Sequence, residues 1–189
     1  PLVRFDDHTN RVSQWRLLFP LVGWALHLPQ KMYLALPHLG CLLVLGFVAW
    51  LTHRHTLDPG QSLAATLLVA TSSWFFVSSG WLGYFDAWYV LGLLVVTFAP
   101  SRRWAWAAVL LTPWIDERFV LTLPLVLVLR TTYFAACPGP ASRRPDDLRA
   151  AWLLLAALLP WAAVRLGVYV TGADSATRPY LAAIPAHQR

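Results

Sequence analysis

Long runs of apolar residues alternate along the chain with short polar stretches. The clearest run, Met32–Thr52, holds about the 20 residues that a helix needs to cross a membrane at 1.5 Å per residue. Further runs of similar length are Gln61–Ser79, Trp81–Ala99 and Leu148–Val170. These runs lack the alternation of strands and are apolar on every side, as lipid-exposed helices are. The pattern predicts an all-α fold, a polytopic transmembrane helix bundle of about five to six membrane segments.

The region around Pro113 departs from this regularity. Trp104–Thr112 is apolar but only about half a membrane thick, and Phe119–Leu129 is apolar again. If the two stretches cross the membrane once, the bias of Lys and Arg towards one side vanishes. If they form a hairpin at Pro113, one side carries seven basic residues between spans and the other carries Lys31 alone. The positive-inside rule favours the hairpin, with a short or broken helix near Pro113 and residues 130–149 as a polar cytoplasmic loop.

The composition agrees with a membrane environment. Hydrophobic residues make up 58% of the chain and charged residues 13%, and 11 tryptophans provide the indole rings that favour bilayer interfaces. The net charge of +6 comes mainly from arginines in short loops, so we expect membrane lipid and no nucleic acid as a partner. The chain begins at Pro1 in a charged stretch, and we expect residues 1–189 to be a single transmembrane domain cut from a longer protein.

Three consecutive charged residues after the Pro113 break are the first candidates for chemistry. Asp116, Glu117 and Arg118 lie between apolar stretches, where charge is unfavourable and usually serves a function. The structural alternative is that Asp116 caps the following helix while Glu117 complements its dipole.

Two further acidic sites lie outside this triplet. Asp86 has Tyr84 and Trp88 as neighbours, and aromatic rings beside an acid could bind a sugar or form an interfacial belt. The pair Asp6-Asp7 could supply a general base or a metal ligand, or could lie in a solvated loop. With the hairpin, Asp86 and the triplet share the outer face of the membrane.

The order of these features resembles the multispanning membrane glycosyltransferases of the GT-C type. Asp6-Asp7, followed by Arg16-Leu17-Leu18-Phe19-Pro20, resembles their first outer loop, which carries an acid and an Arg-x-Leu-x-Pro-like stretch. Asp116-Glu117-Arg118-Phe119, before a stretch with Pro124, is similar to their acid-plus-arginine motif. The resemblance covers about residues 4 to 130. It implies inverting transfer of a sugar from a polyprenyl-phosphate-linked donor to an acceptor at the outer face of a membrane, which we expect to be a bacterial inner membrane.

The resemblance also implies roles for individual residues. Asp6 or Asp7 would take the proton of the acceptor hydroxyl, and Arg118 would stabilise the departing phosphate. Asp116 and Glu117 would orient Arg118 or hold a divalent metal, Mg²⁺ or Mn²⁺. The substrate would be bound by the remaining candidates, Arg16, Tyr84, Asp86 and Trp88.

Two other functions fit the same features. A fragment of a transporter or flippase would also carry broken helices and charges at membrane depth, although the sequence has no inverted repeat. A non-catalytic membrane scaffold would tolerate replacement of the acidic residues.

Overall fold

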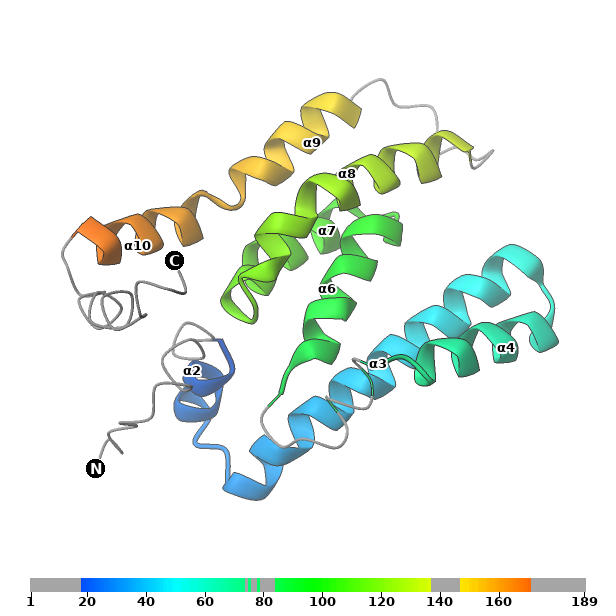
Figure 1. Ribbon diagram of the computed structural model, residues 1–189, viewed down its shortest axis with the longest axis horizontal. Coiled ribbons are helices and arrows are strands. Elements are labelled where there is room, and N and C mark those ends of the chain that lie inside the picture. The colour runs from blue at the N-terminus through cyan, green and yellow to red at the C-terminus, as the bar shows by residue number, and fades with distance from the viewer. Residues whose placement is uncertain (1–17, 74, 76–77, 79–83, 137–146, 171–189) are drawn as a thin grey trace, which may run out of the picture.

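Helices make up the regular structure of this chain. The computed structural model describes residues 18–73, 75, 78, 84–136 and 147–170, and these contain no strand (Figure 1). The helices of this part are α2 (Leu18–Ala25), α3 (Gln30–Thr56), α4 (Pro59–Ala70), α6 (Asp86–Phe98), α7 (Arg102–Leu111), the 3₁₀ turn η1 (Thr112–Trp114), α8 (Arg118–Ala136), α9 (Asp147–Ala156) and α10 (Leu159–Val170).

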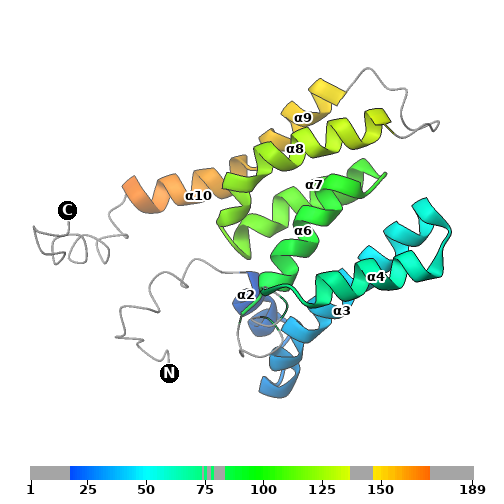
Figure 2. The same ribbon diagram turned by 45° about the vertical axis from the view of Figure 1, so that its right-hand side comes forward.

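Three helices, α3, α6 and α8, run in the same general direction, and α4 and α7 return between them (Figures 1 and 2). At one end, Tyr33 of α3 packs edge-on against Phe85, the residue before α6. At the other end, His55 of α3 and Phe98 of α6 both contact the ring of Tyr133 in α8. These contacts mark two distinct ends of the bundle, one at Tyr33 and Phe85 and the other at Tyr133.

The interior of the bundle lies between α6, α7 and α8. Its fully buried side chains include Val96 of α6, Val109 of α7, and Phe119 and Leu123 of α8. Burying each of these large apolar side chains contributes about 1.5–3 kcal/mol, so the three helices form one packed unit. α9 completes this core through Leu154.

The prediction of five to six membrane segments is wrong for the part of the chain that the structure describes. There, one helical segment, Lys31–Thr56, is long and apolar enough to cross a membrane. It confirms the run predicted at Met32–Thr52. Only 22% of its most apolar stretch is buried, whereas the core helix of a water-soluble domain is mostly enclosed. The apolar helices Asp86–Phe98 and Trp152–Gly167 are shorter.

The other predicted spans are shortened by local backbone chemistry. The run from Gln61 stops at Thr71, where the hydroxyls of Thr71 and Ser72 donate to the carbonyls of Leu68 and Val69 and compete with helical bonding. The run from Leu148 is divided before Pro160, which has no N–H to donate to the carbonyl four residues earlier. An apolar composition over 20 residues did not guarantee an uninterrupted helix.

The hairpin interpretation at Pro113 agrees with the structure. Pro113 lies in η1, and α7 and α8 run in opposite directions on either side of it (Figure 2). Gly92 of α6 faces this turn, and a Cβ atom there would overlap the side chain of Thr112. Beyond the hairpin, α8 continues to Ala136, so residues 130–136, which were expected in a polar loop, are helical. The sidedness of the membrane stays a prediction.

Candidate functional site

Arg118, the first residue of α8, is held by two carboxylates. Its Nε and Nη2 atoms donate to the two oxygens of Asp116 at 2.9 and 2.7 Å, which is a bidentate pair. Nη2 also donates to Oδ1 of Asp86, the first residue of α6. Asp86, Asp116 and Arg118 are called the acid–arginine cluster below. The structure thus joins two acidic sites that lie 30 positions apart in the sequence.

The turn after α7 places Asp116. The backbone N–H groups of Ile115 and Asp116 both donate to the carbonyl of Thr112, at 2.9 and 3.0 Å. Oδ1 of Asp116 then accepts a hydrogen bond from the backbone N–H of Arg118 at 2.9 Å. This bond satisfies an unpaired N–H group at the start of α8, as a capping residue does. The capping role considered from the sequence is therefore present, together with the ion pair.

A cluster of buried apolar residues lies next to both carboxylates in the chain. Phe85, adjacent to Asp86, and Ile115, adjacent to Asp116, are buried together with Phe19 of α2. The rings of Phe19 and Phe85 are stacked with their centroids 4.2 Å apart. Because buried neighbours fix the backbone on either side, the two acids are held at a set separation.

The start of α6 has its own cap. Ser78 is buried, and its Oγ accepts a hydrogen bond from the backbone N–H of Ala87 at 2.9 Å. This contact anchors the first turn of α6, which carries Asp86. A carboxylate in that turn also interacts favourably with the helix dipole.

The two aspartates of the cluster are largely buried, whereas its arginine is about half exposed. The Asp116 side chain is 3% exposed and that of Asp86 is 13% exposed, whereas 53% of the Arg118 side chain is exposed. The hydrogen bond that Arg118 donates to Asp116 raises the pKa of Arg118 above its usual range; burial opposes the rise, and the charges of Asp116 and Asp86 add to it. The guanidinium is therefore permanently charged and presents one face to its surroundings.

Tyr89 of α6 and Thr122 of α8 extend the cluster along the contact between these two helices. The guanidinium carbon of Arg118 lies 5.4 Å from the centroid of the Tyr89 ring, within cation–π range. The Tyr89 hydroxyl is 3.4 Å from Oγ1 of Thr122. Neither residue was predicted from the sequence, although Tyr89 follows Asp86 at the three-residue spacing that shares a helix face.

Glu117 points to a different partner. It pairs with Arg165 of α10 at 2.7 Å, and both side chains are partly exposed. The pair links α10 to the start of α8 beside the cluster.

The acid–arginine cluster does not fit the expected Mg²⁺ or Mn²⁺ ion. Both oxygens of Asp116 accept hydrogen bonds from Arg118, and Glu117 is paired with Arg165. Within the residues that the structure describes, no group of three or more His, Cys, Asp and Glu side chains could hold a metal.

The other candidates are placed as follows. Tyr84 is exposed two positions before Asp86, at the edge of the cluster. Trp88 is half-buried, and its indole N–H donates to the carbonyl of Leu36 at 2.8 Å, where Gly40 gives the ring room against α3. Through that bond, Trp88 packs α6 against α3. Asp6, Asp7 and Arg16 lie outside the described residues.

Comparison with known protein families, characterised proteins and solved structures finds no match to this chain.

Proposed function

We propose that this chain belongs to a glycosyltransferase of a bacterial inner membrane, which transfers a sugar from a polyprenyl-phosphate-linked donor to an acceptor hydroxyl. The observation that carries the proposal is the fixed, half-exposed guanidinium of Arg118, backed by Asp116 and Asp86. Transfer from a phosphate-linked donor needs a cation where negative charge develops on the departing phosphate. An arginine preoriented by two carboxylates meets that need without reorganisation.

Arg118 still has hydrogen-bonding capacity for a phosphate group. Nε and Nη2 are used by the two aspartates, whereas Nη1 donates to no residue in the described part of the chain. The two N–H groups of Nη1 are on the half-exposed side chain, where they can donate to phosphate oxygens. The neighbouring acids and the exposed Tyr84 ring suit the sugar, because carboxylates accept hydrogen bonds from hydroxyls and aromatic rings pack on sugar faces.

The proposed step is a single displacement. The oxygen of the acceptor hydroxyl forms a bond to the anomeric carbon, while the bond from that carbon to the phosphate oxygen breaks. The bonding electron pair leaves with the phosphate oxygen, next to Arg118, and polyprenyl phosphate is released. A carboxylate takes the hydroxyl proton; following the family resemblance, Asp6 or Asp7 is the candidate for this base.

The outer surface of the helices suits a lipid-linked donor. Large apolar side chains are exposed on several elements, among them Leu42 of α3 at 66%, Leu121 of α8 at 83% and Leu166 of α10 at 63%. Exposed apolar surface of this kind marks contact with lipid or with another protein surface. Leu121 lies one turn from Arg118 on α8, so an isoprenoid chain could follow α8 while its phosphate reaches the cluster.

The test measures sugar transfer in membranes that contain the full chain. Radiolabelled polyprenyl-phosphate mannose, glucose and arabinofuranose are supplied in turn, and both released polyprenyl phosphate and labelled product are counted. We expect turnover with one of these donors, and a fall of about 10²–10³-fold in Arg118→Lys, the range seen when one stabilising donor is removed from a transition state. Asp58→Asn is the matched control, because Asp58 caps α4 far from the cluster.

Turnover that is the same in Arg118→Lys and Asp86→Asn as in the unmodified chain, at equal protein levels, would reject the proposal. Absence of turnover with all three donors would also reject it and would favour the scaffold or transporter alternatives.

A further inference from the structure

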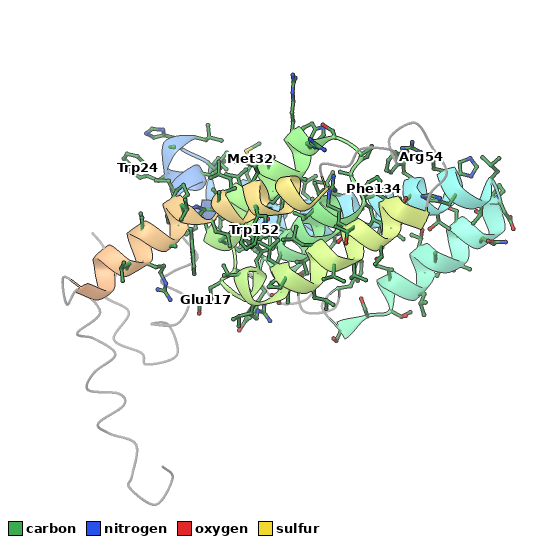
Figure 3. All side chains as sticks on the ribbon, turned by 90° about the horizontal axis from the view of Figure 1, so that it is seen from above. Trp24, Met32, Arg54, Glu117, Phe134 and Trp152 are labelled. Atoms are coloured by element: carbon green, nitrogen blue, oxygen red, sulfur yellow. The ribbon has the colours of Figure 1, made fainter. Side chains whose placement is uncertain are left out.

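The end of the bundle opposite the acid–arginine cluster carries exposed basic residues. His53, Arg54 and His55 form the last turn of α3, and Arg102 and Arg103 form the first turn of α7. Contacts of Tyr133 with both His55 and Phe98 bring these helix ends together. In Figure 3, Arg54 and Phe134 lie towards one end of the molecule, and Met32 and Glu117 lie towards the other.

The arginines at the two ends differ in their partners. Arg118 and Arg165, at the cluster end, are each ion-paired with a carboxylate. Arg54, Arg102 and Arg103 are exposed, and within the described ranges none of them has a carboxylate within ion-pair distance. Unpaired exposed guanidinium groups on one face leave an excess of positive charge for an external anion.

Indole rings accompany these arginines. Trp50 is 46% exposed and Trp104 is 68% exposed, and the guanidinium of Arg54 lies 5.4 Å from the Trp50 ring centroid. Tryptophan beside arginine is typical of the headgroup layer, where an apolar ring, a polar N–H and a cation meet lipid phosphate. Arg54, Arg102, Arg103, Trp50 and Trp104 are called the basic rim.

Arg130 lies at the same end of the bundle but has a structural role. Its Nη1 donates to the carbonyls of Val96 and Ala99 at 2.6 and 3.0 Å, which caps the last turn of α6. Capping helix carbonyls occupies that guanidinium. The basic rim is therefore defined by the arginines that are not used in this way.

We propose that the basic rim binds the headgroups of anionic phospholipids. The length of α3 supports this assignment, because the 26 residues of Lys31–Thr56 extend about 39 Å. When the apolar part of α3 lies in the hydrocarbon of a membrane, Arg54 therefore reaches the headgroup layer. Phosphate-bearing lipids of net negative charge match the guanidinium groups, and the indoles match the interface. This proposal is independent of the transferase activity.

The experiment uses the full chain purified in a neutral detergent. It is mixed with equal amounts of phosphatidylglycerol and phosphatidylcholine, and bound lipids are counted by native mass spectrometry. We expect phosphatidylglycerol to be retained preferentially, and each Arg→Gln change in Arg54, Arg102 or Arg103 to weaken its binding about fivefold. The triple Arg→Lys variant should keep the preference, since the charge is conserved, and Lys31→Gln at the other end of α3 should leave it unchanged.

Two results would overturn the assignment. One is equal retention of the two lipids by the unmodified chain. The other is a phosphatidylglycerol preference that survives in the triple Arg→Gln variant, with helix content checked by circular dichroism. Preferential capture of a short single-stranded RNA added to the same mixture would assign the rim to nucleic acid and would also overturn the proposal.

Discussion

Arg118 begins α8 and donates a hydrogen bond to Asp86, which begins α6, so that one guanidinium joins the starts of two helices that run in the same direction. A cation at a helix N-terminus is opposed by the helix dipole. The two aspartates offset this effect, because Asp116 caps α8 and Asp86 lies in the first turn of α6. The two aspartates therefore hold the positive charge of Arg118 in a fixed position.

Replacing Arg118 by Lys should destabilise the fold. Lysine keeps the charge but cannot form the two parallel hydrogen bonds to the buried carboxylate of Asp116. We expect a loss of about 1.5–3 kcal/mol in the free energy of unfolding, the range for a hydrogen bond to a charged group. Intrinsic tryptophan fluorescence during unfolding in detergent measures the change. Arg102→Lys is the control, and equal stability of the two variants would contradict the bidentate pair.

Adding a methyl group at Gly92 should disturb the turn that holds the cluster. The new Cβ would overlap the buried side chain of Thr112, whose carbonyl accepts the backbone N–H of Asp116. Overpacking of this kind costs about 1–3 kcal/mol, so Gly92→Ala should unfold at lower temperature and lose activity. Gly46→Ala is the matched control, since a Cβ there meets nothing within 4 Å and alanine favours the helix.

The same contact can be tested by a double change. If Gly92→Ala acts by crowding Thr112, then Thr112→Ala in the same chain should recover part of the loss. The coupling energy between the two changes should be about 0.5–3 kcal/mol. Purely additive effects would show that the methyl group acts elsewhere.

Removing the Arg130 guanidinium should loosen the opposite end of α6. Arg130→Gln loses the hydrogen bonds to the carbonyls of Val96 and Ala99. We expect a loss of about 1.5–3 kcal/mol, the range for hydrogen bonds from charged donors. Hydrogen exchange of the α6 amides should speed up, while Arg54→Gln leaves them unchanged.

The contribution of Arg118 to stability should not change with pH in the neutral range. Its pKa is raised in the folded chain, so its contribution is complete below the ordinary arginine pKa and is lost only above the folded value. Both values lie far above the neutral range. The difference in unfolding free energy between the unmodified chain and Arg118→Gln should therefore be constant from about pH 7 to 9. A difference that shrinks in this interval would indicate that another group controls the cluster.

The two ends of α3 should lie on opposite sides of the membrane. In a chain with Cys41→Ala and Cys137→Ser, single cysteines at Lys31 and Arg54 are exposed to a membrane-impermeant thiol reagent in intact cells. The excess of basic residues near Arg54 predicts labelling at position 31 from outside and protection at position 54. Labelling of both positions from outside would show that α3 does not cross.

The sequence by itself determined several features correctly. A run of apolar residues closed by His53-Arg54-His55 was sufficient to locate the long helix α3, because its length and composition are local properties. The positive-inside bias was sufficient to favour the hairpin at Pro113. The capping role of Asp116 was also predictable, since a cap depends on residues two or three positions away.

Only the tertiary structure decided the rest. Whether Asp86 contacts Arg118 depends on the parallel packing of α6 against α8, to which Val96, Phe119 and Leu123 contribute through contacts between distant segments. The number of long helices was overestimated because hydropathy sums over a window, whereas hydroxyl groups and Pro160 end helices at single positions. Composition therefore fixed the preference for an apolar environment, and side-chain packing between helices fixed where the charges meet.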